Sequence, residues 1–346
     1  MHKEDIRDTE QLPIFLKEIN EPAFRLKQIN EWLWQKGAQT FAEMTNLSAA
    51  LREKLAAKFS FCQTVIATER RSKDATVKFI FQLHDGLFVE GVLIPSETRV
   101  TACISSQVGC PLQCIFCATG AAGFKRNLHY SEIFDQYMLM NRRSVELYGL
   151  TISNIVYMGM GEPLLNFDNV VYSIQILTEK WGQALSPSRI TVSTVGLVDG
   201  IKKLADQQLK VSLALSLHCA NELKRIKLMP ITRTNRLDDV RKACTYFAEK
   251  GNSRITIEYL MLRDETDSLK DAANVALFCR AFPVKINIIE YNTTQSGYTR
   301  SSQDTVAQFI EFLESKNMIV NLRRSRGQDI EAACGQLFTI FENKKS

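Results

Sequence analysis

Three cysteines, Cys110, Cys114 and Cys117, follow one another with the spacing C-x3-C-x2-C. Thiolates this close in one loop can bind three irons of a [4Fe–4S] cluster, although a closed set needs four protein ligands. The spacing therefore predicts an iron–sulfur cluster in which one iron stays open to a small molecule with amino and carboxylate groups. Phe116, directly before the third cysteine, is expected to cover that molecule.

A zinc site is the alternative, with Cys103 or His129 as the fourth ligand. Zinc sites favour two C-x2-C pairs, and this chain has no second pair further on. Nine cysteines in 346 residues also do not fit a secreted disulfide framework, which is usually short and evenly paired. We interpret the cysteines that match no chemical position as structural: Cys62, Cys219, Cys244 and Cys279.

The composition is that of a globular protein, with 45% hydrophobic and 23% charged residues. The sequence contains no run of about 18 apolar residues, so we expect no membrane contact. Met1 to Asp8 is polar and lacks the apolar core of a signal peptide, which predicts a cytoplasmic protein. The net charge of +5 permits a nucleic-acid partner without requiring one.

The elements that position the cysteines are predicted from hydrophobic periodicity. Residues 1–62 read as a small helical accessory domain, with Gly37 as a helix C-cap and Ser48 as an N-cap, and residues 63–95 as short antiparallel strands. From residue 96 to 328, strands alternate with amphipathic helices, which predicts a parallel sheet with crossover helices. We expect an α/β fold with a partial (βα)6-type barrel, followed by a C-terminal segment over residues 329–346. The predicted strands of the barrel are 102–105, 155–158, 190–193, 211–217, 255–261, 286–289 and 319–322.

Unusual polar residues follow these strands at the end where chemistry gathers in such folds. Gly161-Glu162-Pro163 ends the second strand, and the Glu162 carboxylate could accept hydrogen bonds from an ammonium group. Alternation along the fourth strand predicts that Ser216 and His218 share one face. Ser193 and Asn292 end two further strands.

Longer motifs surround these residues: Cys103-Ile-Ser-Ser-Gln-Val-Gly-Cys110, Cys117-Ala-Thr-Gly, Met158-Gly-Met-Gly-Glu-Pro163 and Ala333-Cys-Gly-Gln-Leu337. Together they resemble the RlmN/Cfr family of radical-SAM RNA methyltransferases, over nearly the whole chain. The resemblance implies a [4Fe–4S] cluster, two molecules of S-adenosylmethionine per turnover, and a donor such as flavodoxin or ferredoxin. It implies methylation of adenine C2 in the peptidyl-transferase region of 23S rRNA, and of the tRNA adenosine beside the anticodon. The alternative within the family is methylation of adenine C8 in 23S rRNA.

The resemblance also implies roles for individual residues, in a monomeric enzyme. Cys334 would accept a methyl group, and Cys103 would resolve the covalent RNA–enzyme adduct through a transient Cys103–Cys334 disulfide. Glu90 would be the general base that removes the ring proton. Without the family resemblance, Cys334 and Cys103 could also be packed core cysteines, and Glu90 could be a solvent-facing residue. The cofactor site would be lined by Gly161, Glu162, Ser193, Ser216, Leu217, His218 and Asn292.

Two other classes of protein fit the chain less well. A glycyl-radical activase would need the cysteine loop without Cys103 and Cys334, and a zinc-binding RNA module would need four protein ligands. Short basic groups are candidate RNA contacts, with solvated surface charge as the alternative: Lys125-Arg126, Lys224-Arg225 and Arg323-Arg324-Ser-Arg326.

Overall fold

The computed structural model describes residues 3–8, 10–251, 253–292 and 297–337. Its centre is one ten-stranded sheet in the order β14-β13-β12-β11-β10-β9-β6-β5-β4-β3. The strands from β6 to β14 are parallel, and because β6 pairs with β5 rather than β14, the barrel stays open. The parallel strands are β6 (Val100–Cys103), β9 (Asn154–Tyr157), β10 (Ile190–Thr194), β11 (Ser212–Ser216), β12 (Ile255–Met261), β13 (Val284–Glu290) and β14 (Ile319–Arg323).

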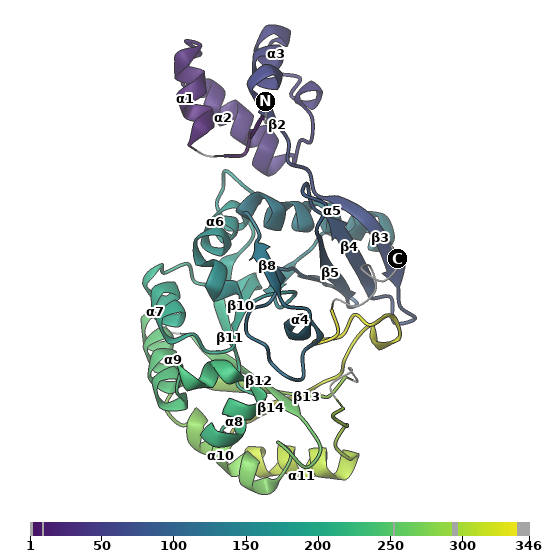
Figure 1. The fold of residues 1–346 in the computed structure, drawn as a ribbon, viewed down its shortest axis with the longest axis vertical. Helices are drawn as coiled ribbons and strands as arrows, with labels where there is room; N and C mark the ends of the chain where they lie inside the picture. Colours follow the sequence, from purple (N-terminus) through teal and green to yellow (C-terminus); the bar gives the residue numbers. More distant parts are fainter. Residues whose placement is uncertain (1–2, 9, 252, 293–296, 338–346) are drawn as a thin grey trace.

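Helices connect successive parallel strands and cover the outer face of the curved sheet (Figure 1). Six strand–helix units precede β14, as the sequence predicted, because each amphipathic helix buries its apolar stripe on the sheet. The connecting helices are α5 (Tyr130–Tyr148), α6 (Phe167–Thr178), α7 (Val198–Asp206), α8 (Glu222–Leu228), α9 (Leu237–Gly251), α10 (Leu269–Cys279) and α11 (Gln303–Glu314).

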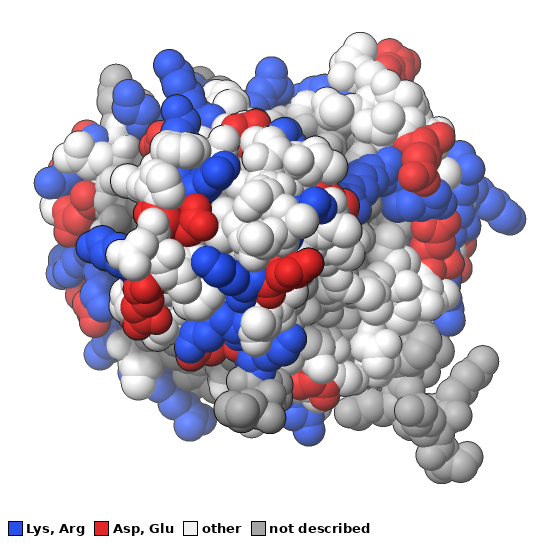
Figure 2. Space-filling model, turned by 90° about the horizontal axis from the view of Figure 1, so that it is seen from above, with Lys and Arg blue, Asp and Glu red and all other residues white. Residues whose placement is uncertain are grey.

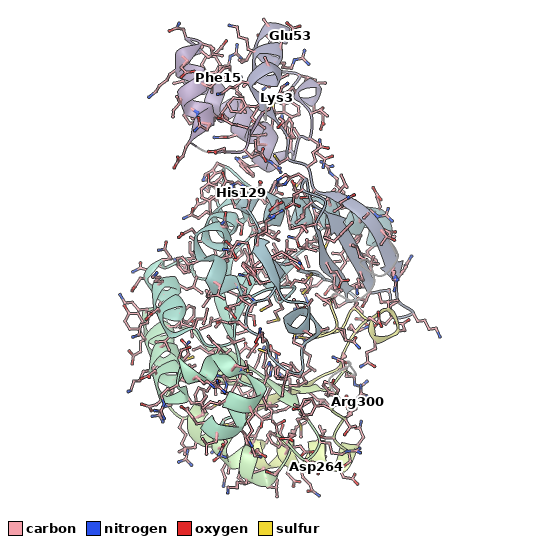
Figure 3. The ribbon with its side chains drawn as sticks, viewed as in Figure 1. Lys3, Phe15, Glu53, His129, Asp264 and Arg300 are labelled. Atoms are coloured by element: carbon pink, nitrogen blue, oxygen red, sulfur yellow. The ribbon has the colours of Figure 1, made fainter. Side chains whose placement is uncertain are left out.

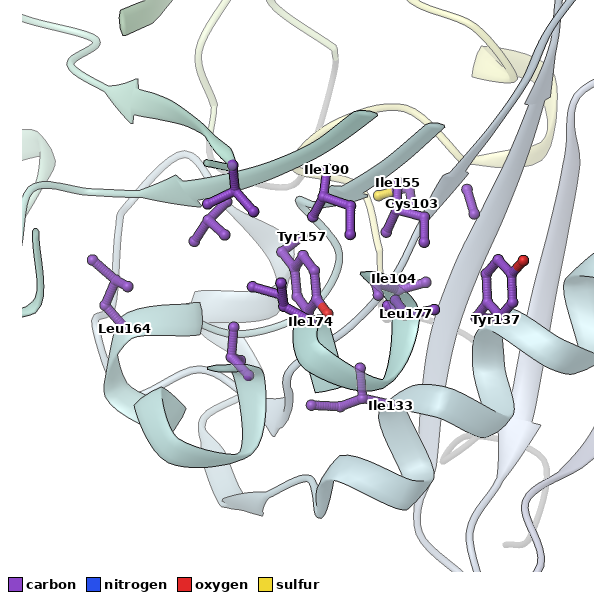
Figure 4. Close-up of a cluster of buried hydrophobic side chains, with 14 of the residues drawn as sticks. Cys103, Ile104, Ile133, Tyr137, Ile155, Tyr157, Leu164, Ile174, Leu177 and Ile190 are labelled. Carbon is purple, nitrogen blue, oxygen red and sulfur yellow. The ribbon is translucent and has the colours of Figure 1, made fainter. Parts of the chain in front are cut away.

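The main core fills the space between the sheet and these helices. Around α5 and α6 it contains Ile155, Tyr157, Ile174, Leu177 and Ile190, which Figure 4 shows packed against one another. The Tyr157 hydroxyl is satisfied within this core by Ser173 Oγ at 2.7 Å. The packed core and the helices therefore hold the strands on the outer face of the sheet. The C-terminal ends of the strands carry the polar side chains.

The predicted antiparallel strands do not form a separate unit. β3 (Val65–Arg71), β4 (Val77–Gln82) and β5 (Phe88–Pro95) continue the same sheet beyond β6. The expected turn between β4 and β5 contains Gly86, whose φ of +81° is readily available to glycine. One edge of the barrel is thus widened into a twisted platform, seen beside β4 and β5 in Figure 1.

The N-terminal helices lie at one end of the molecule, beyond α5 (Figure 1). α1 (Gln11–Glu18), α2 (Phe24–Asn30) and α3 (Ala49–Lys58) correspond to the predicted helices, and the Ser48 side chain caps α3 by accepting from the Leu51 N–H at 3.2 Å. The group is tied to the core by the buried Arg7, whose Nη1 donates to Asp135 of α5 at 2.6 Å. No helix among the described residues is both long and apolar enough to span a bilayer.

A small hairpin that the sequence did not predict supports the cysteine loop. β7 (Gln107–Gly109) pairs with β8 (Phe124–Asn127), and the Cys110 N–H donates to the Gly123 carbonyl at 3.0 Å. The short helix α4 (Ala118–Ala121) lies between the two strands and begins directly after Cys117. The hairpin therefore fixes both ends of the segment that carries the three cysteines.

At the base of this hairpin, close backbone contact leaves no room for a side chain at Gly109. Gly109 and Gly123 both have φ +77°, but a Cβ at Gly109 would lie 1.8 Å from the Gly123 oxygen, whereas a Cβ at Gly123 would meet nothing within 4 Å. Both alanine variants carry the left-handed backbone cost of roughly 1–2 kcal/mol, and only Gly109→Ala adds overpacking of roughly 1–3 kcal/mol.

We therefore predict that Gly109→Ala lowers the free energy of unfolding by about 2 kcal/mol more than Gly123→Ala does. Denaturant titration of the two purified variants measures the difference. Equal losses would mean that the hairpin relaxes freely and does not constrain the cysteine loop.

Candidate functional site

One pocket collects most of the residues that the sequence singled out. Its empty volume, counted together with its open mouth, is about 900 Å³, and it lies at the C-terminal ends of β9, β10 and β11. Nine of the predicted residues line it: Cys110, Cys114, Cys117, Gly161, Glu162, Ser193, Ser216, His218 and Cys334. Because they come from five separate loops and strand ends, the fold alone brings them together.

The three loop cysteines share this pocket with an apolar wall. Phe116, Leu228 and Met229 belong to a buried cluster against which Cys114 and Cys117 pack. Burial raises the pKa of the Cys110 thiol to about 12 and also raises the pKa of Cys114. Thiols in such surroundings become thiolates when they bind metal, so uptake of a cluster here would release protons.

Among the described residues, no three Cys, His, Asp or Glu side chains converge closely enough to hold one metal ion. His129 instead caps α5 at its N-terminus, on the side of the core that faces the N-terminal helices (Figure 3). Three thiols without a fourth ligand match the donor set of an open [4Fe–4S] cluster.

Glu162 is a buried carboxylate with one side open to the pocket. Its Oε2 accepts from the Val195 N–H at 2.9 Å, and its Oε1 accepts from the Leu164 N–H at 3.1 Å. These two bonds fix the carboxylate, and no Lys or Arg side chain forms an ion pair with it among the described residues. Burial outweighs the hydrogen bonds and raises the pKa of Glu162 to about 7. A carboxylate of this kind suits a cationic ligand group such as an ammonium.

Ser216 and His218 both face the pocket, but not for the reason that strand alternation gave. β11 ends at Ser216, and His218 lies beyond it with a left-handed φ of +52°. Its Nδ1 accepts from the Leu260 N–H at 3.2 Å, and its ring meets Phe116 edge-on at 5.1 Å. Burial, helped by the charge of Arg225, lowers the pKa of His218 to about 3, so the imidazole is neutral. The predicted shared strand face is therefore wrong, although both side chains do line the pocket.

Leu217 and Asn292 lie outside the pocket lining. The Leu217 side chain is fully buried in the main core, and its carbonyl accepts from Arg225 Nε at 2.9 Å. Asn292 is buried behind the pocket, where its Nδ2 donates to the Cys334 carbonyl at 3.3 Å and its Oδ1 accepts from Gln328 at 3.2 Å. The structure thus gives Asn292 a position from which it holds the backbone of Cys334.

The segment that carries Cys334 runs back from β14 towards the antiparallel strands (Figure 1). It is anchored first on the β3–β4 turn, where Asp74 accepts from the Gly327 N–H at 3.0 Å and Ser72 donates to Asp329 at 2.5 Å. It then meets the cysteine loop, where the Ala118 N–H donates to the Gly335 carbonyl at 2.9 Å. Residues 338–346, the end of the predicted C-terminal segment, lie outside the described residues.

Cys334 is an exposed residue, and desolvation by the surrounding protein raises the pKa of its thiol. Cys103 is buried at the end of β6, beside Ile155 in Figure 4, and burial together with the nearby Cys334 raises its pKa to about 12. All nine cysteines are free. Cys334 is near enough to Cys103 to help raise the pKa of that thiol, and Cys117 in turn helps raise the pKa of Cys334.

Glu90 is buried, not solvent-facing, and it lies on the platform next to Cys103. Cys103 is opposite Val92 in the β5–β6 pair, so Glu90, two residues away, shares its face of the sheet. The Glu90 carboxylate pairs with Lys78 Nζ at 3.0 Å, and the same Nζ donates to the Glu331 carbonyl at 3.1 Å. Lys78 thus links Glu90 to the segment that carries Cys334.

Sequence reasoning missed Glu258 and did not place Arg323 in the pocket. Glu258 and Arg323 line the pocket and form an ion pair at 3.3 Å. A glutamate within the apolar run Ile-Thr-Ile-Glu-Tyr-Leu-Met was the available signal for Glu258. Of the proposed RNA contacts, four instead have partners within the protein: Arg126, Lys224, Arg225 and Arg323.

Comparison with known proteins identifies this arrangement. Residues 7–60 match the model of the ribosomal RNA large subunit methyltransferase N-terminal domain, and residues 104–276 match the radical SAM superfamily. A Cytophaga hutchinsonii protein named "Probable dual-specificity RNA methyltransferase RlmN" is 47% identical over 95% of this chain and 90% of its own length. The chain belongs to the RlmN family.

Further relatives agree along the full length. A Flavobacterium psychrophilum protein of the same name is 45% identical, over 97% of this chain and 98% of its own. The crystal structure of a radical SAM methyltransferase from Sphaerobacter thermophilus superposes with a TM-score of 0.89 at 36% identity, covering 94% of this chain and 96% of that one. The predicted family and fold class are confirmed. This RlmN-family member is an S-adenosylmethionine-dependent RNA methyltransferase, and its cofactors are a [4Fe–4S] cluster and S-adenosylmethionine.

The raised pKa of Glu162 predicts how the affinity for S-adenosylmethionine depends on pH. Ionised Glu162 attracts the ammonium group of the ligand, and below about pH 7 the carboxylate takes up a proton and loses that attraction. The dissociation constant should therefore be flat above about pH 7 and rise as pH falls, by up to about tenfold per unit.

Calorimetric titration of the anaerobic holoenzyme measures this profile. Glu162→Gln should bind more weakly and show no such pH dependence, whereas Glu97→Gln, at an exposed position, should keep the wild-type profile. A pH-dependent profile that persists unchanged in Glu162→Gln would assign the titration to another group.

Proposed function

We propose that this enzyme methylates C2 of an adenine in the peptidyl-transferase region of 23S rRNA and of the adenosine beside the anticodon in tRNA. The observation that carries the proposal is the position of Cys334, whose thiol lines the same pocket as the three loop cysteines. The dual specificity in the names of the relatives supports two RNA substrates. C2 is a poor nucleophile, so methylation there needs radical chemistry rather than a simple methyl transfer.

In this proposal Cys110, Cys114 and Cys117 hold the cluster, and Glu162 orients the ammonium of S-adenosylmethionine. The cluster would supply one electron, and S-adenosylmethionine would supply the methyl group and the radical chemistry that activates it. Ser193, Ser216 and the neutral His218 offer uncharged polar groups on the remaining pocket wall. The apolar lining around Phe116 excludes water that would quench a radical.

Three protein residues then take part in the reaction with the RNA. Cys334 carries the methyl group as a thioether, and after loss of one hydrogen atom its carbon bonds to the adenine ring. Glu90 accepts the proton from the ring carbon, and the ring gives up one electron, which the oxidised cluster would accept, so that the adduct regains its aromatic, closed-shell form. The Cys103 thiolate attacks the Cys334 sulfur, the carbon–sulfur bond breaks, and the released carbon takes a proton to become methyl. The resulting Cys103–Cys334 disulfide is reduced by an external thiol before the next turnover.

In this proposal the N-terminal helices bind RNA, because residues 7–60 match an rRNA methyltransferase N-terminal domain. Lys and Arg side chains are interspersed with Asp and Glu on the face in Figure 2, so shape and individual phosphate contacts outweigh a single basic patch. We further propose a monomer that acts in the cytoplasm, where its free cysteines stay reduced and flavodoxin or ferredoxin supplies electrons.

The modified nucleoside tests this function directly. RNA methylated by the holoenzyme, digested and chromatographed against both standards, should contain 2-methyladenosine from rRNA and from tRNA. A product of 8-methyladenosine would assign the enzyme to the other branch of the family, and unmodified tRNA would limit it to rRNA. Enzyme with Cys334→Ala should give neither product.

Replacement of Cys103 should trap the reaction half-way. The cluster loop and Cys334 are intact in Cys103→Ala, so the bond between Cys334 and RNA can still form. No other cysteine faces Cys334 from β6, and bulk thiols reach this site poorly. We predict a covalent RNA–protein species that survives denaturing electrophoresis and is missing from the Cys103→Ala, Cys334→Ala double variant. Methylated RNA released normally by Cys103→Ala would exclude its resolving role.

A further inference from the structure

Three Lys and Arg side chains are buried among the described residues, and they differ in what neutralises them. Arg7 is paired with Asp5 at 3.0 Å and Asp135 at 2.6 Å, and Lys78 is paired with Glu90 at 3.0 Å. Arg225, which is 0% exposed, has no carboxylate within 4.0 Å among the described residues. Burying a charge that has no partner costs several kcal/mol of folding free energy, so an anion near this guanidinium would stabilise the protein.

All the hydrogen-bond acceptors of Arg225 are neutral oxygens. Its Nε donates to the Leu217 carbonyl at 2.9 Å, its Nη1 to Thr232 Oγ1 at 2.7 Å, and its Nη2 to the carbonyls of Val195 and Ser216. The pKa of Arg225 reflects the missing partner, because burial lowers it to about 10. In Arg7, by contrast, the two aspartates outweigh burial and raise the pKa.

The cysteine loop lies next to the helix that carries Arg225, so a cluster bound by this loop would supply the missing negative charge. This helix, α8, touches the loop directly, since the Ile115 N–H donates to the Leu228 carbonyl at 3.1 Å. The Met229 N–H donates to the Arg225 carbonyl at 2.7 Å, and Met229 belongs with Phe116 to the buried apolar cluster against which Cys114 packs. Arg225 and Cys114 are therefore attached to the same water-poor part of the protein. In such a low-dielectric setting, opposite charges interact strongly.

We propose that Arg225 is a positioning residue whose buried charge is neutralised by the iron–sulfur cluster at Cys114 and raises the reduction potential of that cluster. When a low-potential donor gives up one electron, the cluster becomes more negative by one charge, while Arg225 keeps its proton and its charge. The reduced form therefore gains more from Arg225 than the oxidised form does. This inference rests on the proposed cluster ligands and adds a residue that sets how easily the enzyme is reduced.

The test compares full-length variants that separate charge from the hydrogen bonds to the pocket loops. Arg225→Lys keeps the charge but loses the forked donors, and Arg225→Met loses both. Arg236→Met removes an arginine that is 71% exposed and follows α8 in the chain, as a matched control. Iron content is measured first, and then the midpoint potential is determined by a redox titration followed by electron paramagnetic resonance.

We expect the equilibrium constant for reducing the cluster to be at least tenfold smaller in Arg225→Met than in wild type. For one electron this is a midpoint potential about 59 mV more negative. Arg225→Lys and Arg236→Met should stay within about threefold of wild type. If Arg225→Met fails to take up the cluster while Arg225→Lys is loaded at the wild-type potential, the charge requirement is supported as well.

Two results would overturn the inference in favour of a purely structural role for Arg225. One is a fully loaded Arg225→Met protein with an unchanged potential, and the other is loss of the cluster in both Arg225 variants. Failure of the proposed cluster site is recognised separately, because wild-type protein would then lack iron or Cys114→Ala would keep a full complement.

Discussion

The hydrogen bond between the Ala118 N–H and the Gly335 carbonyl joins the two halves of the site. On one side of it lies the loop with the three cysteines, and on the other lies Cys334, more than two hundred residues later in the chain. Such a non-local contact costs loop-closure entropy, which rises only slowly with loop length. The cost is offset by the further bonds that anchor the segment on the β3–β4 turn, on Lys78 and on Asn292. The antiparallel strands thus act as a docking platform for Cys334.

Charge burial is the second constraint on this pocket. Glu162, Lys78 paired with Glu90, Arg225 and His218 are all buried around a space that must exclude water from radicals. Burial shifts the pKa of three of these groups: it raises that of Glu162, and it lowers those of Arg225 and His218. These groups reduce the stability of the empty pocket, and binding of oppositely charged partners recovers it.

Much of this architecture could be predicted from the sequence. Strand β12 was predicted residue for residue, because a strand buried on both faces is a continuous apolar run bounded by polar residues. The cysteine spacing and the strand-end residues identified eight residues of one pocket, since parallel strands bring their C-terminal ends to one edge, and the family resemblance added Cys334.

The rest depends on contacts that no local pattern records. The β7–β8 hairpin is polar and short, so it has no hydrophobic period to detect. Arg225 lies in the sequence Leu-Lys-Arg-Ile-Lys and reads as surface charge, yet the loops after β10 and β11 enclose it completely. The left-handed backbone at His218 likewise follows from tertiary packing, and β11 ends at Ser216, one residue before the end of the predicted strand 211–217.

The central claim is that Cys334 is the methyl carrier of a pocket built around Cys110, Cys114 and Cys117. Peptide mass spectrometry of protein produced with its cluster tests this claim most directly. The account predicts one added methyl group on Cys334 and on no other cysteine, and an unmodified Cys334 in the cluster-free Cys110→Ala variant. A methyl group on another residue, or an active enzyme whose Cys334→Ala variant still methylates RNA, would contradict it.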